Sequence, residues 1–561
     1  NSDKNYFLRY SPLNFHVNYQ RPPFFHWMHL ILSYFSLFLS FIFYSCCCCC
    51  FLLSALFKHT VFANFHMGYS KYKFNRLFKK VSIVSTLILI LFIIFTLTFH
   101  GSSKSFDLIV LKNPFQNSIS KYTSLFNTIL EPKCENFTTY NLDSSNYWQY
   151  YGFSHHMQLN EDTLSNILQI NQRQEEEISR IHNELINYYL TPKYPAFTSL
   201  EKSVNGKNLE NNKGIVYVSG EDYYWLTILS IKFIRDHMKD KTTPIEIFVP
   251  FRDANDHYCN KISMIYDNVK CLYFSDYLSW QQMKKISGYQ YKSLALLLTS
   301  FNDILYLDSD NIPINNIQEM FEDENYRKTG FVSWPDFWKR STNYKFYKMS
   351  GLSNYANPIS TIPSIESGQI LINKNSHLKT LLLSYYYNFY GPEYFYPIFS
   401  QGFPGEGDKE TFYLASRVVN EKSFVITGQT TKSFGYKDKN SKYIGQGILQ
   451  MNPSNSNKYW FLHINYPKLN INNLFLNNNY QKNNNIRKWM IIRNAQDDGK
   501  GTGFWKKLGI DLEFEIWNLM IEILTVDFKG FKIFKEIGND EICDYVKEHV
   551  KKLQNSKLNL I

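Results

Sequence analysis

Residues 304–311 read Ile-Leu-Tyr-Leu-Asp-Ser-Asp-Asn, a short apolar run followed by two acids. The apolar run predicts a buried strand, and the acids mark its carboxyl end. Side chains at positions i and i+2 of an extended chain point the same way, so Asp308 and Asp310 could share one divalent ion. Carboxylate oxygens suit Mn²⁺ or Mg²⁺. A solvated turn is the alternative, because chance alone supplies about one Asp-x-Asp in a chain this long.

Apolar runs on both sides of this stretch alternate with helical patterns. The predicted strands are 214–220, 244–250, 269–274 and 304–307, and the predicted helices are 225–234, 293–300 and 513–553. This alternation predicts an α/β fold with a mainly parallel sheet, which binds ligands outside the carboxyl ends of its strands. Residues 470–485 include nine Asn in sixteen positions and are predicted to be a loop insertion.

A membrane anchor is predicted at residues 81–99, nineteen positions without a charge. As a helix they would rise about 28 Å, close to the ~30 Å core of a bilayer. Five Lys or Arg lie within 71–80 and only Lys104 follows closely, so the large C-terminal part is expected in the lumen, as in a single-pass type II protein. A cleaved signal peptide or a buried core helix is the alternative, but the run is longer than a signal h-region and no A-x-A site follows it.

The N-terminal segment is the basic part of the chain. Residues 1–80 contain nine Lys or Arg and one acid, and so carry +8 of the net charge of +11. The remainder lacks an obvious basic cluster, and we therefore expect no nucleic-acid partner. A second apolar stretch, residues 30–57, includes five consecutive cysteines and would give a two-span protein. Alternatively, translation from Met67 makes residues 1–66 a doubtful extension.

The expected domain organisation follows from these features. It comprises 1–66 as the doubtful extension, 67–80 as a basic cytoplasmic tail, 81–99 as the anchor, 100–210 as a lumenal stem, 211–545 as the catalytic domain and 546–561 as a C-terminal tail.

Cysteine and sequon usage agree with a lumenal domain. Cys134, Cys259, Cys271 and Cys543 lie outside the polycysteine run, and an even number permits two disulfides in an oxidising compartment. Cys259 and Cys271 are close enough in sequence to pair, although three connectivities are possible and free thiols are an alternative. Asn136 begins the one usable glycosylation sequon, Asn-Phe-Thr.

Five blocks, in order, resemble the fungal α-1,2-mannosyltransferases of glycosyltransferase family 71. These blocks are 288–313, 334–338, 366–374, 405–411 and 461–468. The resemblance spans about residues 210–545 and implies a GT-A fold, a type II Golgi membrane enzyme, GDP-mannose as donor, and Mn²⁺ or another divalent cation. It also implies transfer, with retention at the anomeric carbon, to mannose acceptors of N-glycan outer chains in cell-wall mannan. A Golgi mannosyltransferase complex is a further expected partner.

The resemblance assigns Asp308 and Asp310 to the metal and suggests His463 as a third ligand. A satisfied core histidine is the alternative for His463. Lys292 and Lys468 are expected to contact the nucleotide or its phosphates, and solvated lysines are the alternative.

Three carboxylates are the catalytic candidates, namely Glu366, Glu406 and Asp408. Glu366 and Gln369 could hydrogen-bond a sugar, or they could form a tight turn into an edge strand at 370–373. Asp408 is expected to bind the donor mannose or the acceptor; its alternative role is the N-cap of a helix at 409–419.

An aromatic sugar platform is expected from Trp334, Asp336 and Trp338, with aromatic core packing as the alternative. Retention can come from a double displacement through a carboxylate or from attack on the same face as the leaving group, and we favour the second. Two other functions remain open. One is an α-1,3-mannosyltransferase or another retaining hexosyltransferase, and the other is a non-catalytic, lectin-like subunit of a mannan-polymerising complex.

Overall fold

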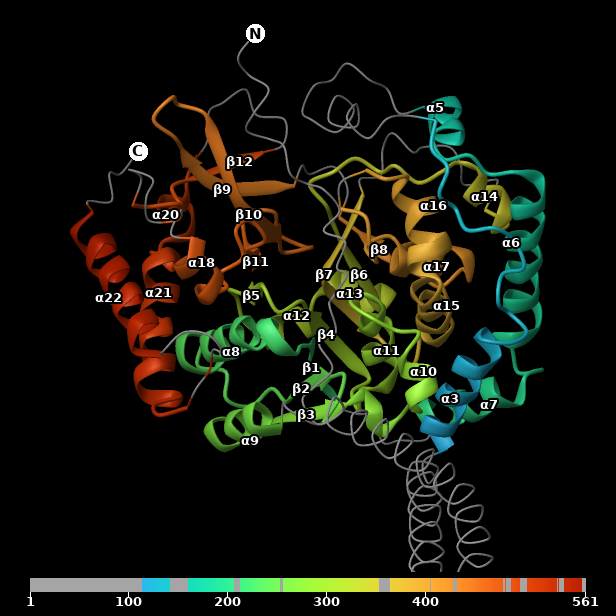
Figure 1. The fold of residues 1–561 in the computed structure, drawn as a ribbon, viewed down its shortest axis with the longest axis horizontal. Helices are drawn as coiled ribbons and strands as arrows, with labels where there is room; N and C mark the ends of the chain where they lie inside the picture. Colours follow the sequence, from blue (N-terminus) through green and yellow to red (C-terminus); the bar gives the residue numbers. More distant parts are fainter. Residues whose placement is uncertain are drawn as a thin grey trace, which may run out of the picture. The chain divides into compact units, whose positions relative to one another are not determined.

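The fold is known from a computed structural model (Figure 1). The structure describes residues 114–141, 160–205, 212–252, 256–352, 364–403, 405–426, 431–477, 480, 486–494, 502–531, 533 and 539–556. The expected extension, tail and anchor before residue 100 lie outside these ranges. Within the ranges, no helix has both the length and the apolar character that a bilayer-spanning segment needs.

A seven-stranded sheet forms the centre of the fold, with strand order β3-β2-β1-β4-β7-β6-β8. Its strands are β1 Lys213–Val218, β2 Ile245–Val249, β3 Val269–Tyr273, β4 Asp303–Leu307, β6 Phe331–Pro335, β7 Ile365–Asn373 and β8 Phe424–Val425. The first four are parallel neighbours, whereas β7 runs antiparallel to both β4 and β6. The prediction of a mainly parallel α/β sheet is therefore confirmed, and each predicted strand overlaps an observed one.

Both faces of this sheet are buried, which explains the nearly continuous apolar sequence of its strands. Along β4, Leu305 and Leu307 belong to one hydrophobic core, while Ile304 and Tyr306 belong to another. Helices α8 and α21 contribute to the first core, and α11 and α15 contribute to the second (Figure 1). Side chains that alternate along each strand thus fill two cores on opposite faces.

The helices of the described residues include short and long members. The α-helices are α3 Pro114–Phe126, α5 Glu161–Asn166, α6 Gln172–Glu184, α7 Pro195–Asn205, α8 Tyr224–Lys232, α9 Asp256–Ile265, α10 Trp280–Met283, α11 Gln290–Leu298, α12 Ile317–Phe321, α13 Glu324–Thr329, α14 Lys345–Met349, α15 Leu378–Phe389, α16 Tyr396–Ser400, α17 Thr411–Val418, α18 Ile471–Asn477, α20 Phe504–Leu508, α21 Leu512–Glu522 and α22 Asn539–Asn555. The π-helical turns are η2 Leu185–Tyr189, η4 Phe233–His237, η7 Gly391–Phe395 and η8 Ile523–Asp527, and the 3-10 turns are η3 Glu221–Tyr223 and η5 Phe274–Asp276.

A second, six-stranded sheet was not predicted from the sequence. Its order is β13-β12-β9-β10-β11-β5, and each of its pairs is antiparallel. Its strands are β5 Asn311–Pro313, β9 Lys432–Lys437, β10 Tyr443–Met451, β11 Tyr459–His463, β12 Ile491–Asn494 and β13 Thr502–Gly503. Because β5 follows β4 after only a tight turn, the acids between them lie where the two sheets meet.

The predicted polar stem over 100–210 differs from the structure in its described part. In α3, Tyr122 and Phe126 are fully buried, and Phe126 packs against Tyr385 and Tyr386 of α15 with ring centroids 5.3 and 5.0 Å apart. The Tyr386 hydroxyl also donates to the carbonyl of Leu130 at 2.7 Å. These helices therefore belong to the compact unit of residues 112–561 rather than to a separate stem.

Two other segments that were predicted from the sequence, a loop and the C-terminal tail, also differ from the structure. Residues 471–477, predicted as loop, form α18, because Ile471 and Leu474 lie three positions apart and are both buried in the core. The tail expected from residue 546 begins inside α22, where Val546 and Val550 are buried. The helical prediction for 513–553 is confirmed for α21, η8 and the described part of α22.

The structure contains a disulfide between Cys259 of α9 and Cys271 of β3, as the sequence allowed. Cys134 and Cys543 are free thiols, so the second disulfide that the cysteine count permitted does not form. Asn136 is exposed, and its glycosylation stays a prediction.

Acid is expected to destabilise the fold through His182 of α6, which is fully buried. Its Nδ1 donates to the Ile178 carbonyl at 2.8 Å, and its Nε2 accepts from the Tyr387 hydroxyl at 2.8 Å. Burial lowers the pKa of His182 to about 4, so the folded protein resists a proton that the unfolded chain accepts near pH 6.5. The neutral His182 contributes its full stabilisation above pH 6.5. As the pH falls towards 4, the free energy of unfolding decreases by roughly 2–3 kcal/mol.

Urea unfolding of the wild type and of His182→Gln between pH 7 and pH 4 measures this effect. We expect the stability difference between the two proteins to shrink towards pH 4. Parallel stability profiles would contradict the assignment.

Candidate active site

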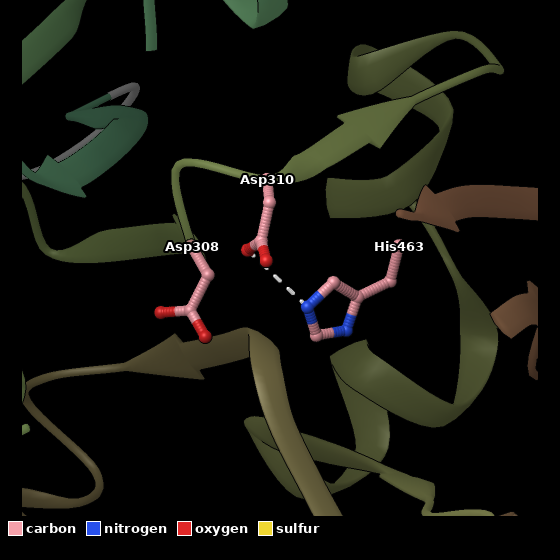
Figure 2. A group of neighbouring side chains, drawn as sticks. All are labelled: Asp308, Asp310 and His463. Atoms are coloured by element: carbon pink, nitrogen blue, oxygen red, sulfur yellow. Dashed lines mark ion pairs between the residues drawn. The ribbon is translucent and has the colours of Figure 1, made fainter. Parts of the chain in front are cut away.

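Asp308 and Asp310 lie in the turn that joins the two sheets, directly after β4 (Figure 2). The Asn311 amide donates to the Asp308 carbonyl at 2.9 Å, so residues 308–311 form a turn rather than the extended chain that the sequence argument assumed. The two carboxylates nevertheless converge. One side-chain ligand atom from each of Asp308, Asp310 and His463 lies within 4.8 Å of the others.

His463 reaches the turn through strand pairing. It ends β11, and its backbone lies opposite Asn311 of β5 in the antiparallel register. The Ile464 amide donates to the carbonyl of Asp310 at 3.0 Å, which fixes the two segments further. The His463 ring consequently points at Asp310, with Nε2 3.3 Å from a carboxylate oxygen (Figure 2).

Asp310 is 5% exposed and is held in its charged form by two cations. Burial opposes ionisation, but Lys468 and His463 keep the pKa of Asp310 well below its usual range. Lys468 forms a close ion pair with the second carboxylate oxygen. Burial likewise opposes protonation of His463, yet Asp310 and Glu366 raise the pKa of His463 to about 9. Lys468 is exposed yet pairs with Asp310 at the site, and its contact with phosphate stays a prediction.

Lys292, in α11, connects two acids that are far apart in sequence. Its ammonium group lies 3.1 Å from Asp308 and 2.9 Å from Asp408. It also donates to the carbonyl and hydroxyl oxygens of Ser367, at 2.8 and 3.1 Å. Lys292 is 3% exposed, so the alternative of a solvated lysine is excluded.

Glu366 and Gln369 lie within β7, which is an interior strand of the first sheet, and not in a turn before an edge strand. A Glu366 oxygen accepts from the Gly368 amide at 2.7 Å and lies 3.7 Å from Nδ1 of His463. The Gln369 side-chain oxygen accepts from the Asn311 amide group at 2.6 Å. Glu366 therefore lies beside His463, a candidate metal ligand. Gln369 supports the turn after β4 through its hydrogen bond with Asn311.

Gly368 is expected to be irreplaceable because its missing Cβ leaves room for His463. A Cβ there would lie 2.6 Å from Cε1 and 2.7 Å from Nδ1 of the His463 ring. Gly368→Ala should therefore turn the ring away from Asp310 and lower turnover about 100-fold. Gly445→Ala is the matched strand control, since its Cβ would meet only Tyr443, at 3.7 Å. Equal turnover in the two variants, measured with the same donor, would contradict this prediction.

The glycine-flanked acidic loop contributes one of its two predicted acids to the buried site. Asp408 is 4% exposed, and its carboxylate pairs with Lys292. The helix that follows, α17, begins at Thr411, whose amide donates to the backbone carbonyl of Asp408 at 3.0 Å, so the side chain of Asp408 is not its N-cap. Glu406 is exposed and accepts from the Gly402 amide at 3.0 Å.

The predicted aromatic platform is wrong for Trp334. This residue is fully buried, donates its indole N–H to the Met451 carbonyl at 2.8 Å and packs edge-on against Phe461. Asp336 is buried in an ion pair of 2.9 Å with Lys409. Trp338 is half-buried and packs against the small cluster that contains Leu164, Ile167 and Phe403. Core packing, the alternative reading, accounts for Trp334.

Sequence reasoning missed several residues that shape the site. The Tyr306 hydroxyl donates to Asp308 at 2.9 Å, and the Asn311 side chain donates to the Gly368 carbonyl at 2.9 Å. Tyr306 lies two positions before Asp308, so strand periodicity could have placed it on the same face. No sequence pattern predicts the contact between Asn311 and β7.

Comparisons with known proteins relate this chain to mannosyltransferases. A family model described as a mannosyltransferase family matches residues 212–364 and 360–464. The α-1,2-mannosyltransferase MNN2 of Candida albicans is 30% identical over 441 residues, covering 69% of this chain and 71% of that protein. The α-1,2-mannosyltransferase MNN21 of the same organism is 31% identical over 424 residues, covering 62% of this chain. This chain thus spans 63% of the length of MNN21, slightly less than two thirds.

Among solved structures, mouse xyloside xylosyltransferase 1 is 14% identical to this chain. The match covers 38% of this chain and 84% of that protein, with a TM-score of 0.26. A score this low carries no argument about fold or activity.

Proposed function

This chain belongs to the family of fungal α-1,2-mannosyltransferases that includes MNN2 of Candida albicans, and we propose that it catalyses the same class of reaction. In the proposed reaction, mannose passes from GDP-mannose to a mannose acceptor of N-glycan outer chains in cell-wall mannan. A new α-1,2 linkage forms with retention at the anomeric carbon. The catalytic domain is proposed to have a GT-A-like fold and to act in the Golgi lumen behind a single membrane anchor.

The convergence of Asp308, Asp310 and His463 is the observation that carries this proposal. Two carboxylates and one imidazole form a donor set suited to Mn²⁺ or another divalent cation. Nδ1 of His463 is buried, makes no hydrogen bond and lies 3.7 Å from a Glu366 oxygen. These residues would hold the cation, which when bound would stabilise the charge of the leaving diphosphate.

The side chains around the acids are suited to an anionic donor. Lys468 and Lys292 bring two ammonium groups to the carboxyl end of β4, where a parallel sheet is expected to bind ligands. We propose that Lys468 moves to the diphosphate when the donor binds, while Lys292 keeps Asp308 and Asp408 in place. A charge that is already held in place, such as that of Lys292, stabilises a transition state with little reorganisation.

The carboxylate candidates favour attack on the same face as the leaving group. Asp408 is paired with Lys292, Glu366 accepts from a backbone amide beside His463, and Glu406 lies on the exposed loop. A carboxylate that is already held by a partner is a weaker nucleophile. We therefore propose that the diphosphate oxygen takes the acceptor proton, and that the protein supplies positioning and charge.

The direct test incubates the purified full-length chain with GDP-mannose, Mn²⁺ and an α-1,6-linked mannan oligosaccharide, and then maps the new linkage. We expect an α-1,2-linked mannose with retained configuration and no product with EDTA. An α-1,3 linkage would point instead to the related transferase, and oligosaccharide binding without transfer would point to a lectin-like subunit.

A further inference from the structure

Two partly exposed tyrosines border the candidate site from different elements. Tyr223 ends the η3 turn after β1 and is 38% exposed. Tyr289 directly precedes α11 and is 50% exposed. Trp334, where an aromatic platform was expected, is buried by the fold. These tyrosines offer aromatic rings at the surface instead.

Tyr289 is tied to the site through the acidic loop. A Cβ on Gly407 would lie 3.4 Å from Cδ2 and Cε2 of the Tyr289 ring, so the ring packs against the loop backbone at Gly407. The next residue, Asp408, reaches Lys292 at 2.9 Å, and Lys292 reaches Asp308 at 3.1 Å. Tyr289 thus lies at the outer end of a chain of contacts that leads to the metal candidates.

Charged groups lie near both tyrosines. The ammonium group of Lys468, paired with Asp310, lies 5.8 Å from the centroid of the Tyr223 ring. Tyr289 instead adjoins the loop that carries Glu406 and Asp408. Partial burial raises the pKa of Tyr289 to about 12, while Lys468 lowers it and Asp408 raises it, so the phenol is neutral and within electrostatic range of both groups.

We propose that the ring of Tyr289 is the platform on which the acceptor sugar lies, an inference that rests on the proposed function. The acceptor is a neutral hexopyranose within a larger glycan. Its apolar C–H face suits an aromatic ring, and its hydroxyls suit carboxylate acceptors such as those of the acidic loop.

The different exposure of Tyr289 and Asp408 assigns Tyr289 to the acceptor rather than to the donor. Asp408, at 4% exposed, lies deeper than Tyr289, at 50% exposed. A glycan chain must enter and leave through solvent, so the half-exposed ring beside the acidic loop is available to it. The acceptor therefore approaches across Tyr289 towards the buried Asp408.

Steady-state kinetics with GDP-mannose and an α-1,6-linked mannose oligosaccharide test this role. For Tyr289→Ala we expect the KM for the oligosaccharide to rise about tenfold while the KM for GDP-mannose stays within about twofold. Tyr289→Phe keeps the ring and should retain a wild-type acceptor KM. Tyr188→Ala, which removes a tyrosine of similar exposure (44%) from the remote η2 turn, is the matched control.

The outcomes separate this inference from the proposed function. If the wild type transfers no mannose, the proposed function fails first. If the wild type is active and Tyr289→Ala leaves the acceptor KM unchanged, or raises the GDP-mannose KM instead, the acceptor platform is overturned. An acceptor KM that rises as much in Tyr289→Phe as in Tyr289→Ala would also overturn it. Circular dichroism and melting temperature identify any variant that fails to fold.

Discussion

Asp310→Asn is expected to lower turnover by about 100- to 1,000-fold or more while leaving the chain folded. Asparagine has nearly the same shape as aspartate, so the turn between β4 and β5 should persist. The substitution removes the negative charge that His463 and Lys468 both face. It also removes one of the three converging side chains of the candidate metal site.

Metal-dependent stability gives a readout of this variant besides activity. A ligand that binds only the folded state raises the melting temperature, so Mn²⁺ should raise that of the wild type and not that of Asp310→Asn. Asp544→Asn is the matched control, because Asp544 is 81% exposed and its ion pair with Lys547 is worth little. Wild-type turnover together with a wild-type response to Mn²⁺ in folded Asp310→Asn would refute the metal assignment.

The local part of the site could be predicted from the sequence, and its non-local part could not. The apolar run before Asp308 specifies a buried strand and its end, because periodicity and burial are encoded locally. His463 meets Asp310 only because β5 pairs with β11, a contact between distant segments that no local pattern encodes. The sequence suggested His463 through family resemblance alone.

The errors in the sequence analysis have a common physical origin. An aromatic residue such as Trp334 fits a core as well as a sugar site, and only the packing of β6 against the second sheet decides which. Seven of the thirteen residues of α3 are polar, yet Tyr122 and Phe126 are fully buried, and Phe126 packs against Tyr385 of α15. Composition predicted a stem there, whereas the spacing of a few apolar residues determines the packing.

Lys292→Met is expected to lower the free energy of unfolding by about 3–5 kcal/mol, because it leaves buried carboxylates without their cation. Lys292 pairs with Asp308 and Asp408 and also donates to Ser367. Methionine matches the length of the lysine stem, so the loss reflects charge and hydrogen bonding more than volume. Turnover should fall as well, since the acids would repel each other and move apart. Urea unfolding and steady-state kinetics of the same preparations measure both effects.

A second substitution separates the charge effect from general damage to the core. Burial raises the pKa of Asp408, Lys292 lowers it and Asp308 raises it again, so removing Lys292 makes the ionised form of Asp408 costlier. Adding Asp408→Asn to Lys292→Met removes that orphaned charge, and the double variant should recover about 1–3 kcal/mol relative to the sum of the single losses. The deficit of Lys292→Met alone should grow as the pH rises, because Asp408 then loses the proton that relieves the repulsion. Strict additivity, with a deficit independent of pH, would mean that Lys292 supports the fold by packing and does not hold the two acids together.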